Sequence, residues 1–293
     1  MKKIDIKKII EPKDTDISKD FPPFISNVAN KIHKLPSFMS NLAIKYFEYI
    51  SHIKEVNKIL KMYENAKDFE FIDKLFTYLD FSYYISDEDK KKIPAKKKLI
   101  CVSNHPLGAL DALSLLSAIG KIRPDVRIVA NDSLLNIENL ANLFLPYNAI
   151  SKKIQKNRIT GIEEALINDE AVIFFPASRL SRFTKRGIRD TRWVKGPIRL
   201  ACKFNAPILP ILIKARNSIL FYISSLFFRN FTNFLIPREI FLKRSKSIKL
   251  KLGDPIPAKI FKSSNISFNI QTKLLKDHIY NIDQNKTFVL KTK

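Results

Sequence analysis

The sequence predicts an α/β fold, in which a mostly parallel sheet is flanked by helices and preceded by an N-terminal helical extension. From about residue 96 onward, short β-rich runs alternate with helical stretches, as in strands joined by crossover helices. The 293-residue chain is 45% hydrophobic, which is enough to bury a large core, and its six glycines are few for a repeat-rich all-β protein. We therefore divide the chain into a helical extension, residues 1–95, and a second domain, residues 96–293.

The extension begins with a polar stretch and continues with two helices. We interpret residues 1 to about 20 as a polar tail. Apolar residues then recur every three or four positions from Phe38 to Tyr63, which is the spacing of one helical face. A second helix is predicted for Phe69–Phe81. The first apolar stripe must cover a neighbouring surface, and we expect that surface to be the protein core rather than the bilayer interface.

The second domain carries the alternating strands and helices. The predicted strands are short apolar runs at Leu99–Ser103, Val126–Ala130, Ala171–Phe175, Ile208–Ile213 and Ile248–Leu252. The predicted helices are Ala112–Ile119, Ile137–Phe144, Ile159–Ile167, Pro197–Phe204 and Asn217–Phe228. In a parallel sheet, ligands bind beyond the carboxyl ends of the strands. His105 and Pro176 each follow a predicted strand, so we expect both at that edge.

A histidine and an aspartate share the turn after the first predicted strand. His105 and Asp111 belong to Asn104–Asp111, which reads Asn-His-Pro-Leu-Gly-Ala-Leu-Asp. An imidazole takes up a proton near neutral pH, and a carboxylate at its other nitrogen fixes the tautomer and stabilises the imidazolium. Since no serine or cysteine follows the histidine within the turn, the pair predicts a base that activates a substrate hydroxyl. The alternative is that Asp111 only caps the helix Ala112–Ile119.

The net charge of +24 indicates anionic partners, such as phospholipid head groups, phosphorylated substrates, acidic carrier proteins or nucleic acid. No nucleic-acid-binding motif accompanies the basic clusters, so nucleic acid is supported by charge alone. A solvated, lysine-rich surface is the simpler alternative for many of these residues. The segment Lys185–Lys203 is one cluster that we expect to attract membrane phosphates or an acidic carrier protein.

The two cysteines, Cys101 and Cys202, lie in apolar segments, which indicates core packing in a reducing compartment. The sequence contains no cluster with metal-ligand spacing, so no metal is expected. Met1–Asp20 lacks the apolar region of a signal peptide, and no apolar run is long enough to span a bilayer. We expect a cytoplasmic location, peripheral on the inner face of the membrane.

Three blocks in order resemble the lysophospholipid acyltransferase family, also called the glycerol-3-phosphate acyltransferase type. They are Asn104–Asp111, Phe174–Arg182 and the Pro-containing strand Asn205–Ile211. The first block, with five residues between histidine and aspartate, is similar to a hemolysin-like subgroup. That subgroup includes O-acyltransferases that complete ornithine- and glycine-containing lipids. The resemblance spans about Leu99 to Ile256 and also includes the segment Gly187–Trp193.

The resemblance implies that residues 96–293 are an acyltransferase domain. Its members move a fatty acyl group from a thioester, acyl-ACP or acyl-CoA, to a lyso-lipid hydroxyl in membrane lipid biosynthesis, without a metal or bound cofactor. His105 is then the general base, and Asp111 orients it. Backbone N–H groups from Gly108 to Asp111 become candidates for stabilising the oxyanion, and Gly108 lets the backbone approach closely or adopt a positive φ. The expected substrate-binding residues are Asn104, Gly108, Ser178, Arg179, Ser181 and Arg182.

The second block departs from the subgroup. The subgroup usually reads Phe-Pro-Ala-Gly-Glu-x-Ser, whereas this chain has Ser178 and Arg179 in place of the glycine and the glutamate. In the family this loop contacts the polar head of the acceptor. A guanidinium there favours phosphate or carboxylate. The acceptor therefore differs, or the chain is a catalytically impaired lipid-binding homologue, or Arg179 simply faces solvent.

Overall fold

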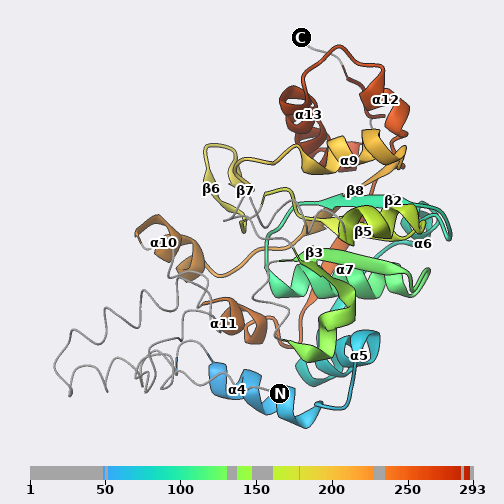
Figure 1. Cartoon of the computed structure of the whole chain (residues 1–293). Helices are drawn as coiled ribbons and strands as arrows, with labels where there is room; N and C mark the ends of the chain where they lie inside the picture. The colour runs from blue at the N-terminus through green and yellow to red at the C-terminus, as the bar shows by residue number, and fades with distance from the viewer. Residues whose placement is uncertain are drawn as a thin grey trace, which may run out of the picture.

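A seven-stranded sheet runs through the centre of the molecule, between two layers of helices (Figure 1). The computed structural model describes residue 49 and residues 52–130, 137–146, 161–177, 179–227, 235–284 and 287–290. The strands of the sheet are β1 (Ser82–Tyr84), β2 (Leu99–Ser103), β3 (Val126–Ala130), β4 (Phe144–Pro146), β5 (Ala171–Phe174), β8 (Ile208–Lys214) and β9 (Ser247–Leu252). A separate two-stranded hairpin is formed by β6 (Arg182–Thr184) and β7 (Gly187–Arg189).

The strand order is β1-β9-β8-β2-β5-β3-β4. The five strands from β8 to β4 run parallel, β9 is antiparallel to β8, and β1 is parallel to β9. The mostly parallel sheet that the sequence predicts is therefore confirmed. β2 lies between β5 and β8, with Cys101 opposite both Ile173 and Leu209. The residues that follow β2 consequently emerge in the middle of the carboxyl edge of the sheet.

Both faces of the sheet are covered, which explains why β2 is a continuous apolar run. Its five residues are all buried; Leu99 and Cys101 face one hydrophobic core, and Ile100 and Val102 face the other. The first core is covered by α5 (Asp68–Leu79), α7 (Ala109–Gly120) and the 3-10 helix η3 (Glu138–Leu143). The second is covered by residues 161–167, α9 (Gly196–Phe204), α12 (Ala258–Lys262) and α13 (Phe268–Tyr280).

The cysteines differ in their surroundings. Cys101 is fully buried in β2, and burial raises the pKa of its thiol to about 12, so the thiol stays protonated. Core packing is thus confirmed for Cys101. Cys202, on α9, is only half-buried.

The described part of the extension packs on the sheet domain. α4 (Ile53–Met62) places Ile59 in the first core, so this end of the predicted stripe covers the core, as expected. The polar tail and residues 38–48 of the stripe lie outside the described residues. β1 lies on the N-terminal side of the predicted boundary at residue 95 but hydrogen-bonds to β9 of the central sheet. The boundary itself stays a prediction.

Several short elements were not expected from the sequence. They are β1, β4, the β6–β7 hairpin, α6 (Asp87–Lys90), α11 (Ile236–Phe241), α12 and the 3-10 helix η5 (Ile282–Gln284). The longer helix α13 was not predicted either. Elements of three to six residues hold too few positions to show a hydrophobic period. The predicted helix Ile137–Phe144 is instead η3 followed directly by β4, and the predicted helix Asn217–Phe228 is α10 (Ile219–Phe227). None of the described helices combines the length and hydropathy needed to cross a membrane.

Candidate active site

His105 and Asp111 form a hydrogen-bonded pair at the carboxyl edge of the sheet. The His105 Nδ1 atom lies 3.1 Å from Asp111 Oδ2. The Asp111 side chain is fully buried, whereas the His105 side chain is 19% exposed. Because the carboxylate accepts the Nδ1 proton, the Nε2 atom of the neutral ring is left with a lone pair. That arrangement suits a base that takes a proton from a second molecule.

Asp111 is not the helix N-cap that one interpretation of the sequence assigns to it. The N-cap is Gly108, and Asp111 is the third residue of α7. Its Oδ2 atom accepts the backbone N–H groups of Leu107, at 2.7 Å, and of Gly108, at 3.0 Å. One oxygen therefore binds the imidazole and also satisfies the first turn of the helix. The Gly108 N–H is engaged in this way, and the expected role of the N–H groups from Gly108 to Asp111 in stabilising an oxyanion stays a prediction.

Burial raises the pKa of the Asp111 carboxyl, and the hydrogen bonds from His105, Gly108 and Leu107 offset part of that rise. Its second oxygen, Oδ1, is buried without a hydrogen-bond partner among the described residues. An isolated buried carboxylate is unfavourable. A proton on the imidazole would supply the missing positive charge, so the pair is arranged to stabilise a protonated His105.

Gly108 adopts the positive φ that the resemblance implies. Its φ is 101°, a value that residues with a side chain rarely adopt. A Cβ atom at this position would lie 3.4 Å from the Leu180 side chain. The glycine thus allows the chain to turn from β2 into α7 while His105 and Asp111 face each other.

The Phe175 ring packs against the face of the His105 imidazole. The two rings are stacked, with centroids 4.1 Å apart and planes 18° from parallel. Phe175 directly follows β5, the strand next to β2, so both rings come from adjacent strand ends. Phe175 is not among the site residues expected from the sequence, although its place at the end of a predicted strand points to this edge.

A second buried carboxylate, Asp190, holds the backbone of His105. Both of its oxygens lie 3.3 Å from the His105 N–H. The same carboxylate accepts the Ser181 hydroxyl at 2.5 Å and the Trp193 indole N–H at 2.8 Å. The Ser181 N–H in turn donates to the His105 carbonyl at 2.9 Å. His105 is therefore fixed through its N–H, its carbonyl and its ring, and the residues after β7 contribute to the site.

Two predicted substrate-binding residues are used within the protein instead. The Asn104 side chain is buried, accepts the Ile213 N–H at 2.8 Å and donates to the Ile213 carbonyl at 3.0 Å. The Ser181 hydroxyl is buried and donates to Asp190. These contacts favour a structural role for Asn104 and Ser181 over the predicted contact with substrate.

The two arginines of the second block lie at different depths. Arg179 is exposed, and no hydrogen bond or ion pair joins it to another described residue. Arg182 is partly buried, with its guanidinium 4.9 Å from the centroid of the Phe221 ring. Ser178 lies outside the described residues. Arg179 and Arg182 thus remain candidates for contact with a substrate.

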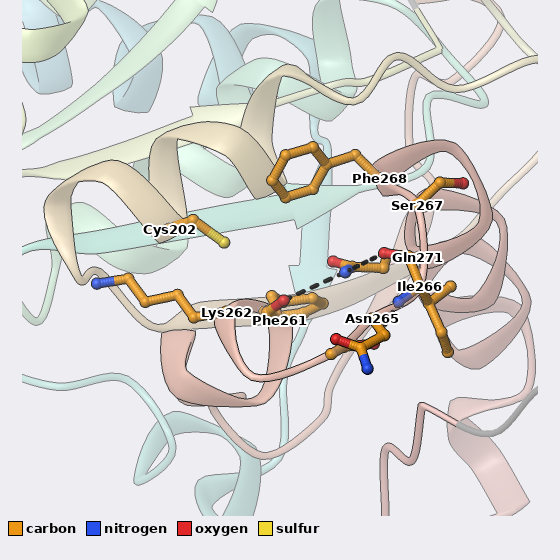
Figure 2. A pocket seen from close by; sticks show the side chains of 9 residues that line it. Cys202, Phe261, Lys262, Asn265, Ile266, Ser267, Phe268 and Gln271 are labelled. Carbon is orange, nitrogen blue, oxygen red and sulfur yellow. Dashed lines mark hydrogen bonds between the residues drawn. The ribbon is translucent and has the colours of Figure 1, made fainter.

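A pocket of about 470 Å³ lies away from this site, among α9, α12 and α13 (Figure 2). Cys202 and Phe268 are among the side chains that line it, and the Gln271 amide donates to the Phe261 carbonyl at its base. None of the predicted site residues lines the pocket. Within the described part of the chain, no group of three or more His, Cys, Asp or Glu residues could hold a metal ion.

Comparisons with known proteins agree with the resemblance in the sequence. The chain is 27% identical over 270 residues to a lyso-glycine lipid O-acyltransferase of Phocaeicola vulgatus, covering 90% of this chain and 94% of that protein. A lyso-glycine lipid O-acyltransferase of Bacteroides thetaiotaomicron is 27% identical over 259 residues, covering 86% and 94%.

Among solved structures, the chain is similar to the 1-acyl-sn-glycerophosphate (LPA) acyltransferase PlsC from Thermotoga maritima. The TM-score is 0.46 and the identity 16%, over 85% of this chain and 95% of that chain. The family model described as Acyltransferase matches residues 26–288. Because this match spans most of the sequence, the chain belongs to the acyltransferase family of enzymes.

Proposed function

We propose that this enzyme is an O-acyltransferase that moves a fatty acyl group from a thioester donor to the hydroxyl of a lyso-lipid in membrane lipid biosynthesis. The observation that carries the proposal is the pairing of His105 Nδ1 with the buried Asp111, which leaves Nε2 to act as a base. The two relatives named as lyso-glycine lipid O-acyltransferases support a lipid hydroxyl as the acceptor. The donor is acyl-ACP or acyl-CoA, and each carries the acyl group as a thioester.

In the proposed reaction, the acceptor hydroxyl gives its proton to His105 Nε2 while its oxygen attacks the thioester carbonyl. A C–O bond forms, the C–S bond breaks, and the leaving thiolate takes the proton back from the imidazolium. Asp111 stabilises the imidazolium between these two proton transfers. The donor is already activated as a thioester and the imidazole moves the proton, so the reaction requires no metal or bound cofactor.

We propose that Arg179, together with Arg182, contacts the polar head of the acceptor. Arg179 is exposed and stands where the hemolysin-like subgroup has a glutamate, so the preference of the loop is reversed towards phosphate or carboxylate. A lyso-lipid with an anionic head group is the acceptor class that fits. The enzyme would act peripherally at the cytoplasmic face of the membrane, where its net charge of +24 favours anionic lipids. Nucleic acid is not proposed as a partner.

The test is acyl transfer by purified protein, with labelled donor and a panel of lyso-phosphatidate, lyso-ornithine and lyso-glycine lipids. Arg179→Glu should lower kcat/KM about ten-fold or more on phosphate- or carboxylate-bearing acceptors, since a hydrogen bond to a charged group contributes roughly 1.5–3 kcal/mol. The matched control is Lys259→Glu, at an exposed position on α12 outside both the second block and the basic segment Lys185–Lys203, which should leave the panel unchanged.

Equal relative activities for the wild type and Arg179→Glu across the panel would show that Arg179 does not contact the head group of the acceptor. If the wild-type protein binds lyso-lipid but transfers no acyl group from either donor, the chain is the impaired lipid-binding homologue, and the proposal of catalysis is wrong.

A further inference from the structure

Helix α10 is apolar on two faces, and only one of them is buried. Phe221, Tyr222 and Ser225 face the protein and are almost inaccessible to solvent. The large apolar side chains of the other face are between 46% and 72% exposed: Ile219, Leu220, Ile223 and Leu226. No charged residue occurs within Ile219–Phe227. Helix α10 therefore packs on the protein through one face only.

The β6–β7 hairpin packs beside α10 (Figure 1). Phe183 of β6 is 44% exposed, and its ring lies 5.3 Å from that of Tyr222. We call Phe183 and the four exposed residues of α10 the apolar patch. Several large apolar side chains gathered on one surface of a soluble protein indicate an interaction site.

The hairpin also places positive charge beside the patch. Residues 182–189 read Arg-Phe-Thr-Lys-Arg-Gly-Ile-Arg and include four cations and no carboxylate. Lys185 and Arg186 are exposed at the tip, where the Arg186 side chain makes a single long ion pair among the described residues, at 3.8 Å from Asp277. An apolar surface next to exposed cations matches the chemistry of an anionic lipid interface, in which acyl chains lie below negatively charged head groups.

We propose that the apolar patch and the hairpin tip dock this enzyme on an anionic bilayer. The side chains of α10 would enter the boundary between head groups and acyl chains, while Lys185 and Arg186 contact lipid phosphates. A second copy of the chain fits this surface less well, because it would bring the same cationic hairpins and two net charges of +24 together.

The docking surface adjoins the active site. Strand β6 begins at Arg182, directly after Ser181, whose N–H binds the His105 carbonyl. An acceptor lipid in the docked bilayer would thus lie next to the turn that carries His105. This consequence rests on the proposed function, whereas the docking itself does not.

Sedimentation with vesicles tests the proposal without any acyl donor. Wild-type protein should bind vesicles of phosphatidylglycerol and phosphatidylcholine, bind pure phosphatidylcholine weakly, and lose binding as salt is raised. The double variant Ile223→Asp, Leu226→Asp should bind the anionic vesicles at least ten-fold more weakly, and its circular dichroism and Tm should match the wild type because both side chains are exposed.

Matched controls separate the patch from a general effect of added charge. Ile167→Asp with Ile270→Asp changes two exposed isoleucines on the opposite helix layer and should leave vesicle binding near the wild-type level. Lys185→Glu with Arg186→Glu should weaken binding to the anionic vesicles at low salt only. The proposal is overturned if the α10 double variant binds anionic vesicles as the wild type does, or if the variant only converts a dimer to a monomer.

Activity assays then distinguish the docking surface from the proposed function. With a short-chain, monomeric acceptor in solution, the α10 double variant should keep the wild-type turnover, and it should lose activity only on acceptor embedded in vesicles. If no protein transfers acyl groups but vesicle binding still depends on the patch, the proposed function fails and the docking surface stands.

Discussion

At the scale of single residues, one carboxylate oxygen, Asp111 Oδ2, both pairs with the His105 imidazole and fixes the turn that carries it. Asp111 Oδ2 receives the imidazole of His105 and two backbone N–H groups of the turn, while Oδ1 is buried without a partner among the described residues. Burial raises the pKa of this carboxyl, so its negative charge is held at a cost in stability. The same charge stabilises a protonated His105, which is what the proposed reaction requires.

The substitution Asp111→Asn should separate these two effects. We expect kcat to fall about a hundred-fold or more with little change in acceptor KM, because an amide cannot stabilise the imidazolium. A carboxyl whose pKa is higher in the folded than in the unfolded state loses stability as the pH rises through the raised value. At pH 7 the uncharged variant should therefore be the more stable protein.

Thermal unfolding between pH 4 and pH 8 measures this difference. Each kcal/mol gained corresponds to a rise of about 2–4 °C in Tm for a protein of this size class, and the gain should shrink towards pH 4 as the carboxyl of the wild type becomes protonated. A wild type that is more stable than the variant at pH 7 and loses this advantage on acidification would show that the carboxylate stabilises the fold.

At the scale of secondary-structure elements, the segment after β7 positions the turn that carries His105. Asp190 is 85 residues from His105 in the sequence, yet its carboxylate accepts the His105 N–H. The backbone of Asp190 is itself fixed, since its N–H donates to the Tyr280 hydroxyl and its carbonyl accepts the Lys276 ammonium. Helix α13 thus fixes the backbone of Asp190, and the Asp190 carboxylate fixes the backbone of His105.

Asp190→Asn should lower kcat about ten-fold or more while leaving KM unchanged, because one acceptor oxygen is replaced by an NH2 group that faces buried donors. The rate is measured per folded enzyme, well below the Tm, so that a loss of stability alone does not change it. The control is Trp193→Phe, which removes a different donor to the same carboxylate and should keep kcat. Equal kcat for Asp190→Asn and wild type would mean that Asp190 only stabilises the fold.

The longer strands were predictable because each bears its pattern locally. β2, β5 and β8 are almost continuously buried, whereas exposed and buried residues alternate along β9. β2 and β3 have the predicted bounds, and β5, β8 and β9 differ by one residue at one end. Contacts between segments that are far apart in the sequence leave no local sequence pattern from which to predict them. The motif predicts that Asn104 contacts the substrate. Its side chain instead hydrogen-bonds to the backbone of Ile213, which is 109 residues away in the sequence. The hydrogen bond from the His105 N–H to the Asp190 carboxylate was not predicted either, because these two residues are also far apart in the sequence.

At the scale of the whole molecule, the order of strands brings the separate blocks to one edge. β2 lies between β5 and β8, so the turn with His105 emerges beside Phe175 of the second block. The β6–β7 hairpin extends from that same edge towards α10 (Figure 1). The pairing of a histidine and an aspartate six residues apart was therefore predictable from the sequence, whereas the surroundings of the pair depend on the whole sheet.

His105 is proposed as the base of the acyl transfer, and comparing the wild type with His105→Ala tests this role. Both proteins are incubated with labelled acyl-ACP or acyl-CoA and lyso-lipid, and labelled product is counted. His278→Ala, which removes an imidazole from α13, is the matched control and should retain activity. The account predicts product from the wild type and the control, and a loss of about a hundred-fold or more in folded His105→Ala. Activity of His105→Ala within a few-fold of the wild type would contradict it.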